Sequence, residues 1–325
     1  MIGSRMAKAR RDASGREGTP SRRRSRLVTL ASRSIPYLGL APALVTFLLL
    51  LGYPIVLVVQ MSLQHIGLKE LISGATTWVG TANFTRILGD PEFLAVTART
   101  FAFMAVNVVL TIVLGTLVAL LLHRIRRSVR LVLSVAMILA WAMPALTGSV
   151  VFQWLFDSKL GVVNWAISSL GIFGSWLNHS WFETGFSTFA IITLLIVWQG
   201  IPFVAFSLFG GILAIPPELD ETARVDGASE RQIFWNITLP SLRPLLLMLA
   251  FLSVIWDFKV FTQVWTMRQG GPDGQTITLS IYAYITGLAQ SQFGVAAAVS
   301  VVMVALLLIV LVPYIRLMLR TQEDV

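Results

Sequence analysis

The chain has 325 residues, of which 56% are hydrophobic and 13% are charged, and its mean hydropathy is +0.77. Soluble domains carry about 25% charged residues, so this composition excludes a soluble globular protein and indicates an integral membrane protein. The absence of cysteine excludes disulfides, thiol catalysis and cysteine-ligated metals. The histidines share no spacing, which argues against a histidine metal site; they are His65, His123 and His179.

The net charge of +9 is concentrated at the N-terminus, where ten of the 25 Lys and Arg residues precede Tyr37. Residues 1–36 are rich in Ser, Gly and Arg and have no apolar face, so we expect a disordered tail. Basic residues beside a membrane span keep that end in the cytoplasm and attract anionic lipid headgroups. No aromatic residues alternate with the basic ones, and nucleic acid is therefore not expected as a partner.

Six apolar stretches are long enough to cross a bilayer, for which a helix needs roughly 20 residues. The expected spans are 37–62, 101–122, 131–154, 188–213, 244–265 and 294–315. The first is too long for the hydrophobic region of a cleaved signal peptide. The sequence therefore predicts an all-α membrane domain with six transmembrane helices over residues 37–317.

The basic residues fall mainly on one side of these spans. Besides the ten in the tail, four lie in 123–130, three in 214–243 and two after residue 315, which makes nineteen of the 25. The positive-inside rule assigns that side to the cytoplasm. We therefore expect a multi-pass protein of the cell membrane with both termini, the C-terminal tail 318–325 and segment 216–240 in the cytoplasm.

Segment 216–240 is patterned as a helix, a glycine turn and a second helix. Pro216 and Pro217 suit a first helical turn, where the missing N–H needs no partner. Gly227 can adopt the positive φ that ends the first helix. Ser229 and Gln232 have the spacing of a capping box that begins the second helix. Pro240 and Pro244 are expected to mark the turn into the fifth span. Spacing alone fits a surface connector as well as a docking element for a partner.

A glutamate, a glycine and a proline also stand at set distances in this segment. Their contexts are Glu221-Thr222-Ala223, Asp226-Gly227-Ala228 and Ile237-Thr238-Leu239-Pro240. This pattern resembles the EAA loop of ATP-binding cassette (ABC) importer permeases, with Thr222 in place of an alanine. Outer segments resemble those of the carbohydrate-uptake, maltose/oligosaccharide-type members; they are Trp78-Val79-Gly80, Asn83-Phe84, Asp90-Pro91-Glu92-Phe93 and Gly270-Gly271-Pro272.

The resemblance implies a permease subunit of an ATP-driven importer for a sugar or oligosaccharide, which is not an enzyme. Its implied partners are a second homologous permease, two ATPase subunits and an extracytoplasmic sugar-binding protein, within membrane lipid. The loop would be the coupling helix that docks on the ATPase, with Glu221 as the docking carboxylate and Gly227 as the turn. The implied coupling residues are Glu221, Thr222, Ala223, Asp226, Gly227 and Ala228.

The chain contains no G-x-x-x-x-G-K-[ST] phosphate loop. ATP and magnesium would therefore be bound by the partner ATPase subunits, and no cofactor is expected in this chain. This absence fits an importer built from separate subunits and excludes a fused ABC protein.

Polar groups within the hydrocarbon layer are costly and usually face a cavity or the bundle interior. The candidates for a substrate path are Gln153, Trp154, Gln199, Trp256, Asp257 and Gln263. Amides and a carboxylate suit sugar hydroxyls, and indoles suit sugar rings, although an amide can instead hydrogen-bond a neighbouring helix. Pro144 and Pro202 permit kinks in the third and fourth spans, either as gates or as static bends.

Rival functions have less support from the sequence. A secondary transporter driven by an ion gradient needs ionisable residues in both halves of the chain, but Asp257 and Lys259 lie on the same expected helix. A membrane-embedded enzyme needs clustered carboxylates or histidines at one face, and here the acidic cluster is explained by helix termini. A permease for glycerol phosphate or another polyol-like solute remains open.

Overall fold

A computed structural model describes residues 40–171 and 174–323. The expected tail 1–36 and the last residues, 324–325, lie outside the described residues. The chain divides into two compact units, Met1–Leu57 and Val58–Val325. In the first unit, the described residues are helical from Leu40 and include the π-helical turn η1 (Leu48–Gly52). The helix continues past the boundary as α3 (Tyr53–Ser62).

Within the described residues, five helices are long and apolar enough to cross a membrane, and a sixth crossing results if one bent helix pair counts as a single span. The described chain is almost entirely helical, with one two-stranded sheet. The predicted all-α fold with six spans is therefore confirmed, with the third span in an unexpected form.

The second unit begins with a small folded segment. Strands β1 (Gln64–His65) and β2 (Thr77–Trp78) pair antiparallel, with Gln64 opposite Trp78. Helices α4 (Leu68–Ser73) and α5 (Ala82–Leu88) lie within and after this hairpin. The buried Asn83 amide donates to the Ser62 and Gln64 carbonyls, each at 2.9 Å. One carbonyl belongs to the last residue of α3 and the other to β1, so this amide joins the segment to the end of α3.

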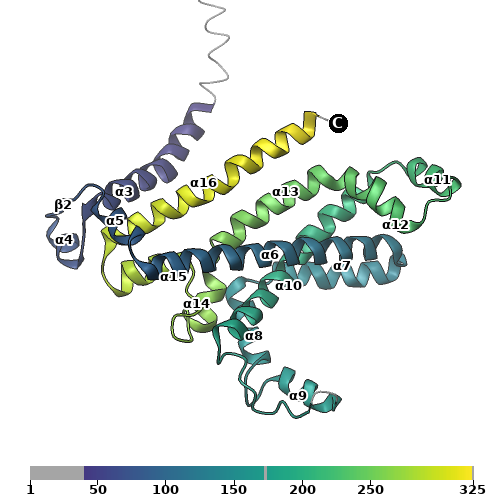
Figure 1. Cartoon of the computed structure of the whole chain (residues 1–325), viewed down its shortest axis with the longest axis horizontal. Helices are drawn as coiled ribbons and strands as arrows, with labels where there is room; N and C mark the ends of the chain where they lie inside the picture. Colours follow the sequence, from purple (N-terminus) through teal and green to yellow (C-terminus); the bar gives the residue numbers. More distant parts are fainter. Residues whose placement is uncertain (1–39, 172–173, 324–325) are drawn as a thin grey trace, which may run out of the picture. The chain divides into compact units, whose positions relative to one another are not determined.

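Helix α6 (Pro91–Arg124) begins ten residues before the expected second span. Asp90 caps it by accepting a hydrogen bond from the Glu92 N–H at 2.9 Å, and Pro91 occupies the first turn. The helix packs along α10 (Gly185–Leu213) (Figure 1). A Cβ at Gly115 would lie 2.5 Å from Val204, so the two helices approach too closely there for any larger residue.

The third expected span, 131–154, is two helices rather than one. Helices α7 (Arg127–Ala142) and α8 (Ala145–Leu155) meet at an angle of 104°. The residue before a proline is pushed out of the helical region, and Met143, before Pro144, has ψ 125°. Pro202, in contrast, lies inside α10 and does not interrupt it. Pro144 thus breaks its span, whereas Pro202 is accommodated.

The remaining elements complete the second unit. They are α9 (Val162–Leu170), α11 (Pro217–Val225), α12 (Glu230–Ile233), η2 (Phe234–Thr238), α13 (Leu239–Phe258), α14 (Thr262–Arg268), α15 (Leu279–Tyr284), η3 (Ile285–Ala289) and α16 (Phe293–Glu323). Helices α13 and α16 pack on each other, and α13 also packs on α6 and α10. Apolar side chains between α6, α10 and α13 form one core, which includes Val204, Leu208 and Leu249.

Candidate functional site: the elbow and a polar cavity

Residues 216–240, which we call the elbow, fold as the sequence predicts over their first half. Pro217 starts α11 and Gly227 follows it with φ 83°. The Ala228 N–H bonds to the Ala223 carbonyl and the Gly227 N–H to the Arg224 carbonyl, at 2.9 and 3.1 Å. These two bonds form a Schellman motif, which ends a helix on a left-handed glycine. The turn is therefore encoded by Gly227.

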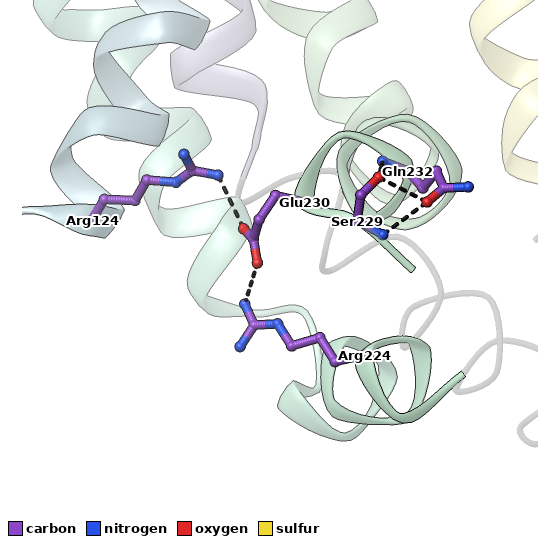
Figure 2. Close-up of polar contacts among 5 residues, drawn as sticks. All are labelled: Arg124, Arg224, Ser229, Glu230 and Gln232. Atoms are coloured by element: carbon purple, nitrogen blue, oxygen red, sulfur yellow. Dashed lines mark hydrogen bonds and ion pairs between the residues drawn. The ribbon is translucent and has the colours of Figure 1, made fainter. Parts of the chain in front are cut away.

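The second helix of the elbow begins with the expected capping box. The Ser229 N–H donates to Gln232 Oε1 at 2.8 Å, and the Gln232 N–H donates to Ser229 Oγ at 3.4 Å (Figure 2). The expected turn at Pro240 and Pro244 is wrong, because α12 continues through η2 into α13. In η2 the Leu239 N–H bonds to the Phe234 carbonyl, and this wider turn lets the helix pass Pro240 without a break.

The resemblance-derived coupling residues lie on the open side of the elbow. Glu221, Thr222, Asp226 and Gly227 are exposed, and Ala223 and Ala228 are half-buried. The Thr222 hydroxyl donates to the Glu218 carbonyl at 2.7 Å, so the departure from alanine is satisfied within α11. None of the α11 residues is buried, although the helix carries apolar side chains. The helix therefore presents a face that no other described element covers.

An ion-pair network joins the elbow to the end of α6. Glu230 Oε2 lies 3.1 Å from Arg124 Nη2, and Glu230 Oε1 lies 3.0 Å from Arg224 Nη2 (Figure 2). The same residues line a groove of about 750 Å³ with Asp220, Arg231 and apolar residues of α6. Sequence reasoning did not pair Glu230 with Arg124, because the two are 106 residues apart. The signal available was that each stands at a helix terminus.

A polar cavity of about 390 Å³ lies where the α7–α8 break meets α10, α13 and α14. It gathers four of the six substrate-path candidates, namely Gln199, Trp256, Asp257 and Gln263. Trp141 and Lys259, which are not among these candidates, also line it. Asp257 is only 7% exposed, and no described residue forms an ion pair with it. The cavity thus offers amides, a carboxylate, an ammonium group and two indole rings.

The other two candidates lie elsewhere. Gln153 donates its amide to the Thr266 and Met267 carbonyls at 3.0 and 2.5 Å, which tethers α8 to α14. The Trp154 side chain is 81% exposed and does not line the cavity. Gln199 combines both roles, since it lines the cavity and also donates to the Met143 carbonyl at 3.1 Å. That carbonyl is one that the break before Pro144 leaves without a helical partner.

The described residues contain no candidate metal site. Among residues 40–171 and 174–323, no group of three or more His, Asp or Glu side chains could hold a metal ion. A further cavity of about 500 Å³ between α6 and α10 is lined almost entirely by apolar side chains. Its polar side chains are Arg99 and Thr193, so it offers few hydrogen-bonding groups to a sugar.

Comparison with known proteins gives one consistent result. The family model described as "Binding-protein-dependent transport system inner membrane component" matches residues 111–320. The diacetylchitobiose uptake system permease protein DasB of Streptomyces coelicolor is 44% identical over 96% of this chain and 94% of its own. The trehalose/maltose transport system permease protein MalF of Thermococcus litoralis is 31% identical over 86% of this chain and 92% of its own.

The fold matches a solved transporter as well. A chain of a bacterial ABC transporter that imports the acidic polysaccharide alginate aligns with a TM-score of 0.77, over 91% of this chain and 99% of that chain. The sequence identity is 20%, so this match establishes the fold.

Proposed function

Since the chain belongs to the family of binding-protein-dependent transport system inner membrane components, we propose that it is the permease subunit of an ATP-driven importer for a sugar or oligosaccharide. The observation that carries the proposal is the 44% identity to a diacetylchitobiose uptake permease over nearly the whole of both chains. A permease moves its substrate without chemical change, so the chain is not an enzyme.

We propose that the elbow couples this subunit to an ATPase. Support comes from α11, which buries none of its residues and presents Glu221 on its exposed face. Val225, on the same helix, is 87% exposed. Covering this apolar side chain with a partner would be favourable, because apolar surface would be removed from water. Glu221 would supply a charged contact to the ATPase and Gly227 the fixed turn. ATP and magnesium would be bound by the ATPase subunits.

We propose that the polar cavity forms part of the substrate path. Its volume lies in the usual range for small-molecule sites, about 300–1,000 Å³. Trp141 and Trp256 would stack on a sugar ring, while Gln199, Asp257 and Gln263 would exchange hydrogen bonds with hydroxyls. Movement of α8 or α14 against α10 would open and close the cavity, since these helices meet at it.

The mechanism follows from the coupling of these two regions. An extracytoplasmic binding protein would deliver the sugar to this subunit and a second permease. ATP-driven closure of the ATPase pair would push α11 from the cytoplasmic side. The helices packed on α13 and α6 would then rock between outward-open and inward-open states.

The test is uptake by the assembled transporter. The chain is reconstituted in proteoliposomes with its companion permease, ATPase and binding protein, and ATP-dependent uptake of diacetylchitobiose and maltose is measured. We expect uptake of at least one of them, together with ATPase stimulation by the sugar-loaded binding protein. Uptake by the chain alone, driven by a proton gradient without ATP, would overturn the proposal.

A substitution then tests the coupling role. Glu221→Ala should reduce co-purification of the ATPase and ATP-dependent uptake together. Glu218→Ala is the matched control, because Glu218 is another exposed carboxylate on α11 outside the coupling motif. Equal loss in both variants would assign the effect to the overall charge of α11 rather than to Glu221.

A further inference from the structure

Three helix termini meet beside the elbow, and a single carboxylate lies between them. Arg124 stands in the last turn of α6 and Arg224 in the last turn of α11. Glu230 is the first residue of α12. Helix C-termini favour positive charge and helix N-termini favour negative charge, so each of the three ions stands where its own helix stabilises it.

The geometry makes these ions one network rather than two alternative pairs. Glu230 uses Oε2 for Arg124, at 3.1 Å, and Oε1 for Arg224, at 3.0 Å (Figure 2). Each carboxylate oxygen therefore has its own guanidinium, and both contacts can exist at once. One contact closes the elbow on itself, and the other fastens it to a membrane-spanning helix.

Few other contacts hold α11 in place. No residue of α11 is buried, so packing contributes little to its placement. Ile233 of α12, in contrast, is 4% exposed and is anchored in the protein. Between these two helices the chain turns at Gly227, which has no side chain and is exposed. Glu230 is the side chain that ties both α11, through Arg224, and α6, through Arg124, to the anchored helix.

We propose that Glu230 is a positioning residue for coupling, which holds α11 to the cytoplasmic end of α6 so that displacement of α11 also moves α6. The proposal rests on the coupling function proposed for the elbow. A loosely held α11 would turn about Gly227 when an ATPase pushes on it, and the motion would be lost. With the network intact, α11, α12 and the end of α6 move as one body, and α6 carries the motion along α10.

The expected effect is moderate, because the side chains of all three ions are more than half exposed. Exposed ion pairs are individually weak. Two of them acting together correspond to about a fivefold change in the equilibrium between the fastened and the released position of α11. Such an effect is measured as sugar transported per ATP hydrolysed, in the full transporter in proteoliposomes. ATPase co-purification is measured in parallel, since the network holds the elbow and does not itself form the dock.

The decisive variants reverse charge. Glu230→Arg places three arginines together, and we expect transport per ATP to fall about fivefold or more while ATPase co-purification stays unchanged. The triple variant Arg124→Glu, Arg224→Glu, Glu230→Arg restores both contacts with opposite polarity. We expect its transport per ATP to be at least threefold higher than that of Glu230→Arg, although its charges no longer suit the helix termini.

Arg231→Gln is the matched control, because Arg231 lines the same groove but its side chain forms no ion pair with any residue that the structure describes. It should leave transport per ATP unchanged. A triple variant no better than Glu230→Arg, or a loss in Arg231→Gln as large as in Glu230→Arg, would overturn the network. A wild-type transporter without ATP-dependent uptake would instead overturn the proposed function, so the two failures are distinguishable.

Discussion

The elbow and the polar cavity are built in opposite ways. In the elbow, the hydrogen bonds that shape the chain around Gly227 and Ser229 join residues no more than five positions apart. The cavity is assembled from a helix break, α10, α13 and α14, whose residues span Trp141 to Gln263. The shape of the elbow is specified by local sequence and the cavity by packing, whereas the attachment of the elbow to α6, through Glu230 and Arg124, is a long-range contact.

This difference predicts how each region responds to substitution. A change in the elbow should alter local backbone geometry and coupling while leaving the membrane bundle intact. A change in the cavity should alter the substrate path or the stability of the bundle. An elbow substitution that destabilised the membrane bundle, or a cavity substitution that altered coupling alone, would contradict this division.

The largest effect is expected at Gly227. Its φ of 83° costs a residue with a side chain roughly 1–2 kcal/mol and a β-branched residue more. No atom lies within 4 Å of a Cβ built there, so the penalty is conformational and not steric. Gly227→Val should reduce ATP-dependent uptake about tenfold or more, with normal amounts of the chain in the membrane.

Gly227→Asn is the control for that experiment, because asparagine tolerates the left-handed region. It should retain most of the uptake. If valine and asparagine were equally harmful, the turn would require glycine for close approach of a partner rather than for its backbone conformation.

The next effect concerns the cavity. Asp257→Asn keeps the shape of the side chain but replaces a carboxyl oxygen with an amide NH2, and the lost hydrogen bond to a sugar hydroxyl contributes up to about 1.5 kcal/mol. Uptake should therefore fall about tenfold while ATPase co-purification is unchanged. Trp154→Phe should change uptake less than about twofold, since Trp154 is 81% exposed and outside the cavity. A reversed order would place the substrate path at Trp154 rather than at the cavity.

A smaller effect is expected at the helix break. Gln199→Leu removes the donor to the Met143 carbonyl, and this acceptor is only partly buried, so its loss costs about 1 kcal/mol, the lower end of the range for an unpaired acceptor. Thermal unfolding of the purified chain in detergent should show a lower midpoint than the wild type. An unchanged midpoint would mean that the bond does not stabilise the α7–α8 break, and Gln199 would then serve the cavity alone.

How well each region can be predicted from the sequence depends on how far apart in the chain its contacting residues lie. The Ser229–Gln232 capping box and the Gly227 turn could be predicted, because every partner lies in the same short segment. The six apolar spans could be predicted from length and hydropathy. Pro144 indicated a kink, but the 104° bend depends on how α8 packs on α14, which no local pattern encodes.

Side-chain partners across the bundle could not be predicted. Gln153 and Gln199 are both amides in expected spans, yet one tethers α14 and the other faces the cavity. Their difference arises from tertiary packing, which brings Thr266 within reach of one and Met143 within reach of the other. The bond between Glu230 and Arg124 has the same origin.

The smallest effect tests the class of long-range contacts. Tyr282 Oη donates to Asp90 Oδ2 at 3.1 Å, across 192 residues. Burial, and then the hydrogen bond to Asp90, raise the pKa of Tyr282 from 10.0 to about 12. A raised pKa stabilises the folded chain fully below pH 10, and this contribution is lost as pH rises through 12. Because the phenol is only half-buried, solvent screening limits the contribution to about 1 kcal/mol or less.

The wild type should therefore lose slightly more stability between pH 10 and 12 than Tyr282→Phe does, measured as the difference between their unfolding midpoints. Parallel pH curves would show that this contact, unlike the local contacts of the elbow, does not contribute to folding.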